Sequence, residues 1–179
     1  AAKRNLQLAA DIDANNPEVY EAYGLLYQST GEYELADDNY RKAITKDNKN
    51  ISRARNNYAA FLYTQERYED AQKQLNEVVK DTLYASRPNA FVNLGMCRLK
   101  LFDTQGAEEA FVRALAMDRT NQVALVEVAQ IRFDAGDYAS ASQFYATYRA
   151  VARQQTARAL LLGTRLARVE GDRDSEASY

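Results

Sequence analysis

The chain has 179 residues, of which 46% are hydrophobic and 27% charged, with a formal net charge of −2. This composition excludes a chain that is disordered throughout, and the longest uncharged apolar stretches are far too short to span a bilayer. Acidic and basic residues are interspersed and leave no broad basic face, so we expect no nucleic-acid partner.

Two series of small residues recur along the chain at intervals of 34 to 36 positions. The first series is Gly24, Ala59, Gly95, Ala129 and Gly163. The second is Ala2, Ala36, Ala71, Ala107, Ala141 and Ser175. Each member of the first series precedes a member of the second by 12 residues, so the two series mark one repeating unit.

A large apolar residue follows each member of the second series by four positions: Leu6, Tyr40, Leu75, Phe111, Tyr145 and Tyr179. Two antiparallel helices approach closely only where side chains are small, and a large residue one turn later fills the space where they diverge. A single hairpin cannot cover its own apolar stripe, so neighbours must stack on it. The pattern resembles the tetratricopeptide repeat and predicts an all-α, right-handed superhelix of stacked antiparallel helix pairs.

The whole chain, 1–179, is then a single array. In chain order we expect the second helix of a truncated first repeat, four full repeats and a truncated sixth repeat. Their ranges are 1–16, then 17–50, 52–85, 88–121 and 122–155, and finally 156–179. The link Asp81-Thr82-Leu83-Tyr84 is the least regular part of the pattern.

The segment Asp11-Ile12-Asp13-Ala14-Asn15 begins like a calcium-binding loop but lacks two of its requirements. Asn16 replaces the glycine of the sharp turn, and Ala22 stands where a bidentate Glu is needed. We interpret the segment as a turn whose Pro17 starts the next helix, and we expect no metal site.

No catalytic constellation is visible. The chain has no histidine, the commonest general base and metal ligand. Its one cysteine, Cys97, lies among apolar residues and is expected to be a small buried hydrophobe. No glycine-rich phosphate loop is present. We therefore expect no enzyme activity, no cofactor and no small-molecule substrate.

In tetratricopeptide hairpins the first helices line a concave surface, and the exposed positions there are the candidate partner-binding residues. They are Leu25, Gln28, Asn56, Ala60, Tyr63, Val92, Met96, Leu99, Val126, Gln130 and Phe133. Exposed apolar side chains of this kind commonly mark a partner groove, but they could equally pack within the superhelix. Only Asn56 matches the carboxylate clamp of chaperone adaptors, so we expect no such clamp.

Arginines accumulate toward the end of the chain: Arg149, Arg153, Arg158, Arg165 and Arg168. They could meet an acidic partner or lipid headgroups, or form a solvated face whose aliphatic stems lie on apolar neighbours.

Several local strings are distinctive, among them Asn56-Asn57-Tyr58-Ala59-Ala60-Phe61-Leu62 and Leu160-Leu161-Leu162-Gly163-Thr164-Arg165-Leu166-Ala167. Two more fall outside the repeat consensus: the Asp81-Thr82-Leu83-Tyr84 link, and Gly171-Asp172-Arg173-Asp174 with Ala177-Ser178-Tyr179. Together they resemble the type IV pilus biogenesis lipoproteins of the PilF and PilW type, the pilotins of the pilus secretin. The resemblance covers essentially the whole chain, in order.

The resemblance implies a protein-binding pilotin that supports outer-membrane localisation and multimer assembly of the type IV pilus secretin, with the secretin subunit as partner. It implies a location at the periplasmic face of the outer membrane. We expect the lipid anchor on an N-terminal segment that is not part of this chain, and not on Cys97. The alternative is a tetratricopeptide scaffold or adaptor in another multiprotein complex.

Overall fold

The computed structural model describes residues 6, 8, 13, 15–46 and 51–171, whose regular secondary structure is entirely α-helical. The chain divides into two compact units, Ala1–Leu101 and Phe102–Tyr179. Within each unit, consecutive helices pack against one another as hairpins. The predicted all-α fold of stacked helix pairs is confirmed.

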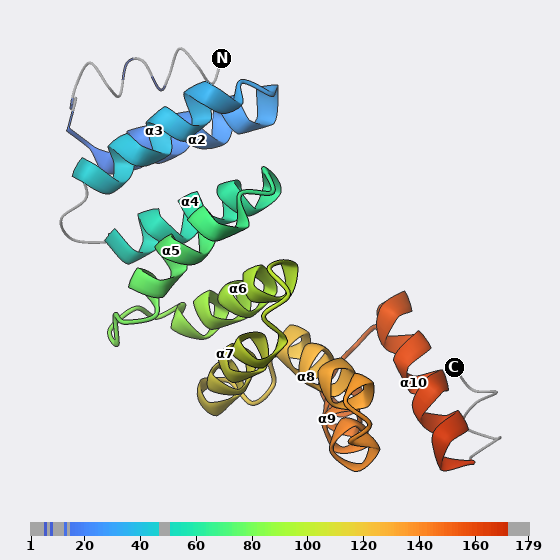
Figure 1. The fold of residues 1–179 in the computed structure, drawn as a ribbon. Helices are drawn as coiled ribbons and strands as arrows, with labels where there is room; N and C mark the ends of the chain where they lie inside the picture. Colours follow the sequence, from blue (N-terminus) through green and yellow to red (C-terminus); the bar gives the residue numbers. More distant parts are fainter. Residues whose placement is uncertain (1–5, 7, 9–12, 14, 47–50, 172–179) are drawn as a thin grey trace. The chain divides into compact units, whose positions relative to one another are not determined.

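The first unit is a two-layer stack of short helices (Figure 1). Its described helices are α2 (Pro17–Thr30), α3 (Tyr33–Lys46), α4 (Ile51–Thr64), α5 (Tyr68–Val78) and α6 (Arg87–Lys100). α2 pairs with α3 and α4 with α5, while α4 contacts both α2 and α6. The helices α2, α4 and α6 therefore form one layer, which we call the first-helix layer of this unit.

The second unit repeats the same construction. Its described helices are α7 (Thr104–Met117), α8 (Gln122–Asp134), α9 (Tyr138–Val151) and α10 (Ala157–Glu170). α8 packs on both α7 and α9, and α10 packs on α9 and α8. Its core is built from residues of α8, α9 and α10, including Leu125, Tyr145, Tyr148 and Leu162.

The members of the two small-residue series that lie in the described helices occupy the interior of these hairpins. Ala36, Ala71, Ala107 and Ala141 have no exposed surface. The large residues that follow them by four positions are also buried, with Tyr40 at 1% and Phe111 at 0% exposure. The sequence pattern therefore identified core positions correctly.

The turns within the pairs follow from local chemistry. Asn16 caps α2 by accepting a hydrogen bond from the backbone N–H of Glu18, and Pro17 occupies the first turn. Gly31 ends the same helix with a left-handed φ of 80°, a conformation that glycine adopts without strain. Asp137 caps α9 by accepting from the N–H of Ser140.

Parts of the predicted repeat division fall outside the described residues. This applies to most of the helix expected at 1–16 and to residues 172–179 of the sixth repeat, whose first helix is α10. The expected repeat at 88–121 contributes α6 to one unit and α7 to the other. The repeat boundaries stay a prediction. Within the described ranges, no helix combines the length and apolarity needed to cross a bilayer.

Candidate protein-binding groove

A groove of about 260 Å³ opens on the first-helix layer of the first unit, between α4 and α6. Its lining is mainly apolar and comprises Ala59, Ala60, Tyr63, Thr64, Leu75, Asn93, Met96 and Cys97. Helical geometry explains the set, because residues three to four positions apart lie on one face. Tyr63 follows Ala59 by four positions, and Met96 follows Asn93 by three. Among the predicted binding residues, Ala60, Tyr63 and Met96 are brought together here.

Tyr63 is held in place by a neighbouring aromatic ring. Its ring meets that of Tyr68 edge-on, with centroids 5.2 Å apart and an interplanar angle of 67°. The ammonium group of Lys100 lies 5.9 Å from the Tyr68 centroid. Edge-to-face rings and a cation above a ring face are both attractive arrangements. One wall of the groove therefore presents a pre-positioned aromatic side chain.

The floor of the groove is chemically inert. Leu75 and Cys97 are each 1% exposed. Burial raises the pKa of the Cys97 thiol to about 12, so the reactive thiolate is not populated near neutral pH. The prediction that Cys97 is a small buried hydrophobe is confirmed.

Polar groups line one side of the groove. Asn93 donates from Nδ2 to Oδ1 of Asn56 at 3.3 Å, which links α6 to α4. Asn56 is thus a neighbour of the groove, although the sequence suggested it only as an exposed position. Amide groups beside an apolar slot can hydrogen-bond a peptide backbone while the slot takes a side chain.

The remaining predicted residues are more scattered. Leu25 on α2 is 57% exposed, and Leu99 on α6 is half-buried. Gln28 accepts a hydrogen bond from the Tyr40 hydroxyl at 2.9 Å. On α8, Gln130 donates to Asp134 at 2.9 Å, and Phe133 packs against the core of its own unit. Gln28 and Phe133 therefore have structural contacts of their own.

The expected exposure is wrong for Val92 and Val126, which are each only 7% exposed. Val126 belongs to the core cluster of the second unit together with Tyr148 of α9 and Leu162 of α10. The reason is that α8 is covered on most of its circumference, with every residue from 124 to 129 buried. A sequence pattern that assigns one open face to each first helix misses this.

A polar network that the sequence did not reveal lies between α3, α4 and α5. Asp37 accepts from the Tyr58 hydroxyl at 2.9 Å and pairs with Arg67 at 2.6 Å. It also pairs with Nε of Arg41 at 2.7 Å. Burial and the hydrogen bond to Asp37 raise the pKa of Tyr58. Only the coincidence of charged residues on successive helices could have suggested this network from sequence.

A second missed contact is the ion pair between α8 and α10. Arg158 donates from both Nη nitrogens to the two carboxylate oxygens of Glu127, at 2.5 and 2.9 Å. Glu127 is buried, and burial raises its pKa although Arg158 partly offsets the effect. Arg158, one of the five arginines noted in the sequence, is therefore engaged inside the unit.

Residues 17–50 and 98–166 each match a family model of the tetratricopeptide repeat. The type IV pilus assembly protein PilF of Pseudomonas aeruginosa is 40% identical over 178 residues, or 99% of this chain and 70% of that protein. An uncharacterised protein of Haemophilus influenzae is 31% identical over 96 residues, or 54% of this chain and 53% of that protein.

Solved structures agree with these sequence relatives. The structure of Pseudomonas aeruginosa PilF matches with a TM-score of 0.92 and 39% identity, covering 99% of this chain and 79% of that one. PilW, described as a widely conserved type IV pilus biogenesis factor, matches with a TM-score of 0.81 over 99% of this chain and 80% of that one. Its 23% identity supports the fold alone. By its sequence identity to PilF along nearly its whole length, the chain belongs to the PilF family of tetratricopeptide-repeat proteins.

Proposed function

We propose that this chain is a type IV pilus biogenesis protein that acts as a pilotin. It binds the subunit of the pilus secretin and supports localisation of the secretin to the outer membrane and its assembly into multimers. The observation that carries the proposal is the 40% identity to the pilus assembly protein PilF over 99% of the chain. A tetratricopeptide array supports a scaffold that works by binding proteins, because its stacked helices present an extended surface.

The groove between α4 and α6 is the proposed contact with the partner. Its apolar lining and adjacent amide pair suit an extended peptide segment that inserts one large apolar side chain. Tyr63 supplies a rigid aromatic wall, and Met96 supplies an adaptable one. The remaining predicted surface positions, Leu25 and Leu99 among them, would extend this contact along the layer.

The proposed location is the periplasmic face of the outer membrane, in the cell envelope where the pilus is built. The anchor is a lipid on an N-terminal cysteine of the full gene product. Cys97 is unsuited to that role because it is 1% exposed in the interior of the first unit.

The groove is tested by replacing Tyr63 and Met96 with Asp. A carboxylate in an apolar slot carries a desolvation cost that any apolar ligand would meet on entry. We expect affinity for the purified secretin subunit to fall at least about tenfold, which corresponds to about 1.4 kcal/mol. Binding is measured by titration calorimetry, and folding by circular dichroism.

Leu35→Asp is the matched control, because Leu35 lies on α3 outside the groove and is 44% exposed. It should bind like the unaltered chain and melt at a similar temperature. Loss of helical structure in the groove variants would assign Tyr63 and Met96 to the core instead. Equal weakening by the control would assign the effect to added charge.

The pilotin role itself is tested in cells. Deleting the gene should deplete secretin multimers from the outer-membrane fraction, and expression of the gene from a plasmid should restore them. Normal multimers in the deletion strain would contradict a pilotin role, whatever the groove binds.

A further inference from the structure

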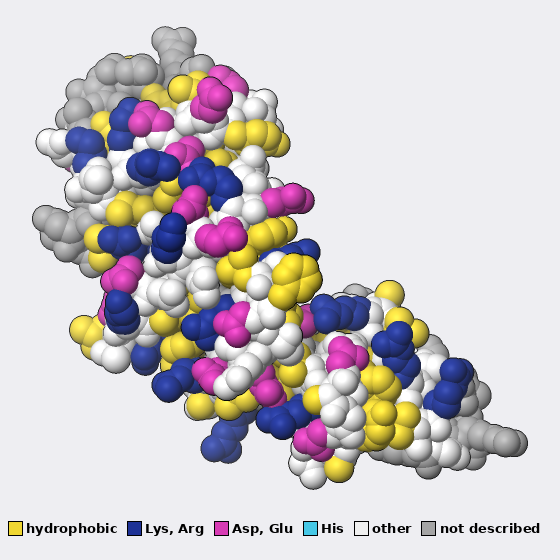
Figure 2. Space-filling model, viewed as in Figure 1, with side chains coloured by type: hydrophobic (Ala, Val, Ile, Leu, Met, Phe, Trp, Pro, Cys, Tyr) yellow, Lys and Arg dark blue, Asp and Glu magenta, His cyan; other side chains and the backbone are white. Residues whose placement is uncertain are grey.

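A second hollow in the first unit has a different chemistry from the apolar groove. It has a volume of about 350 Å³ and is lined by residues of α3, α4 and α5, on the side that carries the Asp37 network. Arg41, Arg55 and Arg67 all contribute to its lining, and among the described lining residues Asp70 alone carries a carboxylate. Over α3 and α5, Figure 2 shows basic and acidic side chains intermixed, so the local balance of charge decides what can bind.

The charges of this hollow do not cancel. Arg67 is fully engaged: Nη1 donates to Asp37 at 2.6 Å, and Nε and Nη2 donate to Asp70 at 3.2 and 3.0 Å. Arg41 and Arg55 add two further positive charges. Three charged residues beside the lining also count: Asp37, Lys73, which pairs with Asp70, and Glu77, which interacts with Arg55. Four cationic groups then face three carboxylates, which leaves one positive charge.

The unbalanced charge is available as hydrogen-bond donors. Arg41 uses its Nε to contact Tyr58 at 3.0 Å and Asp37 at 2.7 Å. Arg55 donates from Nη1 to the neutral amide of Gln74 at 2.7 Å. Within the described part of the chain, neither Nη of Arg41 nor Nη2 of Arg55 has a hydrogen-bond acceptor. Arg55 forms no close ion pair there, and its electrostatic partner, Glu77, is itself paired with Lys80 at 2.6 Å.

We propose that this hollow binds an acidic side chain of a protein partner, held by Arg41 and Arg55. Guanidinium groups with free parallel N–H bonds match the geometry of a carboxylate. The half-buried side chain of Ile44 also lines the hollow and can cover the methylene groups of a glutamate. The site goes beyond the proposed secretin contact, because it lies on another face of the helices and selects by charge.

The test uses short fluorescent peptides and the intact chain. One peptide carries two Glu residues and has both ends capped, a second carries Gln in their place, and a third is the Gln peptide with a free C-terminal carboxylate. We expect the Glu peptide to bind best by fluorescence anisotropy, with affinity that falls as salt is raised. Arg55→Gln should weaken its binding about tenfold, and Arg55→Lys should restore part of the loss.

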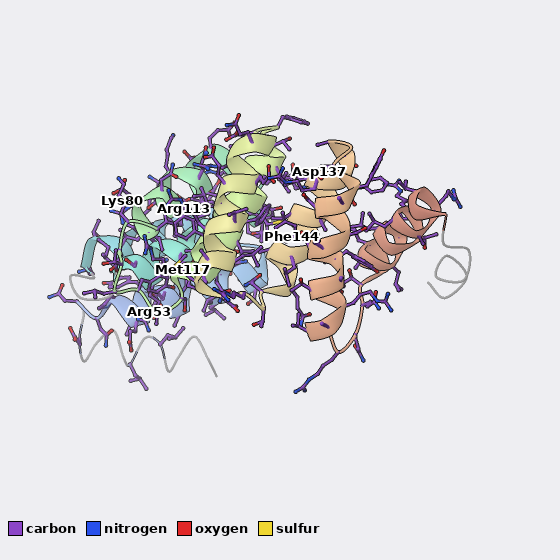
Figure 3. All side chains as sticks on the ribbon, turned by 90° about the horizontal axis from the view of Figure 1, so that it is seen from below. Arg53, Lys80, Arg113, Met117, Asp137 and Phe144 are labelled. Carbon is purple, nitrogen blue, oxygen red and sulfur yellow. The ribbon has the colours of Figure 1, made fainter. Side chains whose placement is uncertain are left out.

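Arg113→Gln is the control for removing one positive charge, because Arg113 extends from α7 in the second unit and is exposed (Figure 3). This variant should bind the Glu peptide like the unaltered chain. The site is refuted if Arg55→Gln binds like the unaltered chain while remaining folded by circular dichroism. It is also refuted if Arg113→Gln weakens binding equally, or if only the peptide with a free C-terminus binds.

Discussion

At position 24 of α2, the ring of Tyr40 from α3 lies where a side chain would begin. A Cβ atom placed on Gly24 would come within 2.9 to 3.0 Å of three ring atoms of Tyr40. Tyr40 is itself 1% exposed and is held by its hydrogen bond to Gln28 and by the Phe61 ring, whose centroid is 5.2 Å away. The ring therefore has little freedom to move aside, and Gly24 determines how closely the two helices approach.

We expect Gly24→Ala to destabilise the first unit by about 1 to 3 kcal/mol, because the added methyl group overpacks a rigid contact. The measurement is urea denaturation followed by circular dichroism. Alanine is intrinsically the better helix former, so propensity alone would predict the opposite sign.

The double variant Gly24→Ala, Tyr40→Leu separates packing from other effects. Leu removes the ring that the new methyl group would meet. The double variant should therefore lose less free energy of unfolding than the two single variants lose in sum. If the two losses of unfolding free energy simply added, the methyl group at position 24 would not compete with the Tyr40 ring for space. The next repeat has Ala59 and Leu75 at the positions that Gly24 and Tyr40 hold here, and both line the groove between α4 and α6. There an alanine faces a side chain smaller than tyrosine.

At the scale of helices, the sequence predicted the interior better than the surface. The spacing of Ala36, Ala71 and Tyr40 specifies which helix faces meet, because small and large residues at a fixed interval have only one way to pack. The sequence assigned Tyr63 and Met96 to one surface because both lie on first helices, and both line the groove between α4 and α6. Their role in binding stays a prediction. Val126 was misplaced because coverage by a neighbouring helix is a tertiary fact that no local pattern encodes.

The sequence did not predict side-chain contacts between helices that are far apart along the chain. The pairing of Glu127 with Arg158 spans 31 positions and joins α8 to α10. Glutamate on a helix is ordinarily interpreted as a solvated residue, since charged side chains are rarely buried without a partner. Its burial depends on where α10 packs.

The buried Glu127 should make stability depend on pH. Burial raises its pKa above the ordinary 4.5, so the folded chain binds more protons than the unfolded chain just above that pH. The contribution of Glu127 to the free energy of unfolding should therefore fall as pH rises from about 4 toward 7. Each unit of pKa difference corresponds to about 1.4 kcal/mol. The measurement is the difference in the free energy of unfolding in urea between the unaltered chain and Glu127→Gln, taken at pH 3 and at pH 7.

Asp137→Asn provides a comparison of opposite sign. The side-chain and backbone hydrogen bonds from Ser140 lower the pKa of Asp137, so its contribution to stability is lost as pH falls through that lowered pKa. Between pH 3 and pH 7, the stability difference caused by Glu127→Gln and that caused by Asp137→Asn should change in opposite directions. If the Glu127 difference grew with pH, the attraction of Arg158 would outweigh desolvation.

At the scale of the whole molecule, the proposed pilotin role requires a link to the membrane that the described helices do not provide. None of them could span a bilayer. A single cysteine is present in the chain, and it is buried beneath the groove. A buried thiol whose pKa is raised to about 12 is a poor acceptor for any modification. Under the proposed role, a lipid on an N-terminal cysteine, and not on Cys97, would provide the membrane attachment.

We expect the full-length gene product to incorporate radioactive palmitate in cells, and Cys97→Ala to leave that incorporation unchanged. A version with serine in place of the proposed N-terminal cysteine should lose the label, remain folded and leave the outer-membrane fraction. Secretin multimers should then decline in that fraction, because a binding scaffold without an anchor cannot deliver its partner there. Labelling that depended on Cys97 would contradict the placement of the anchor. A fully unlabelled but functional protein would leave the secretin contact intact and remove lipidation from the proposal.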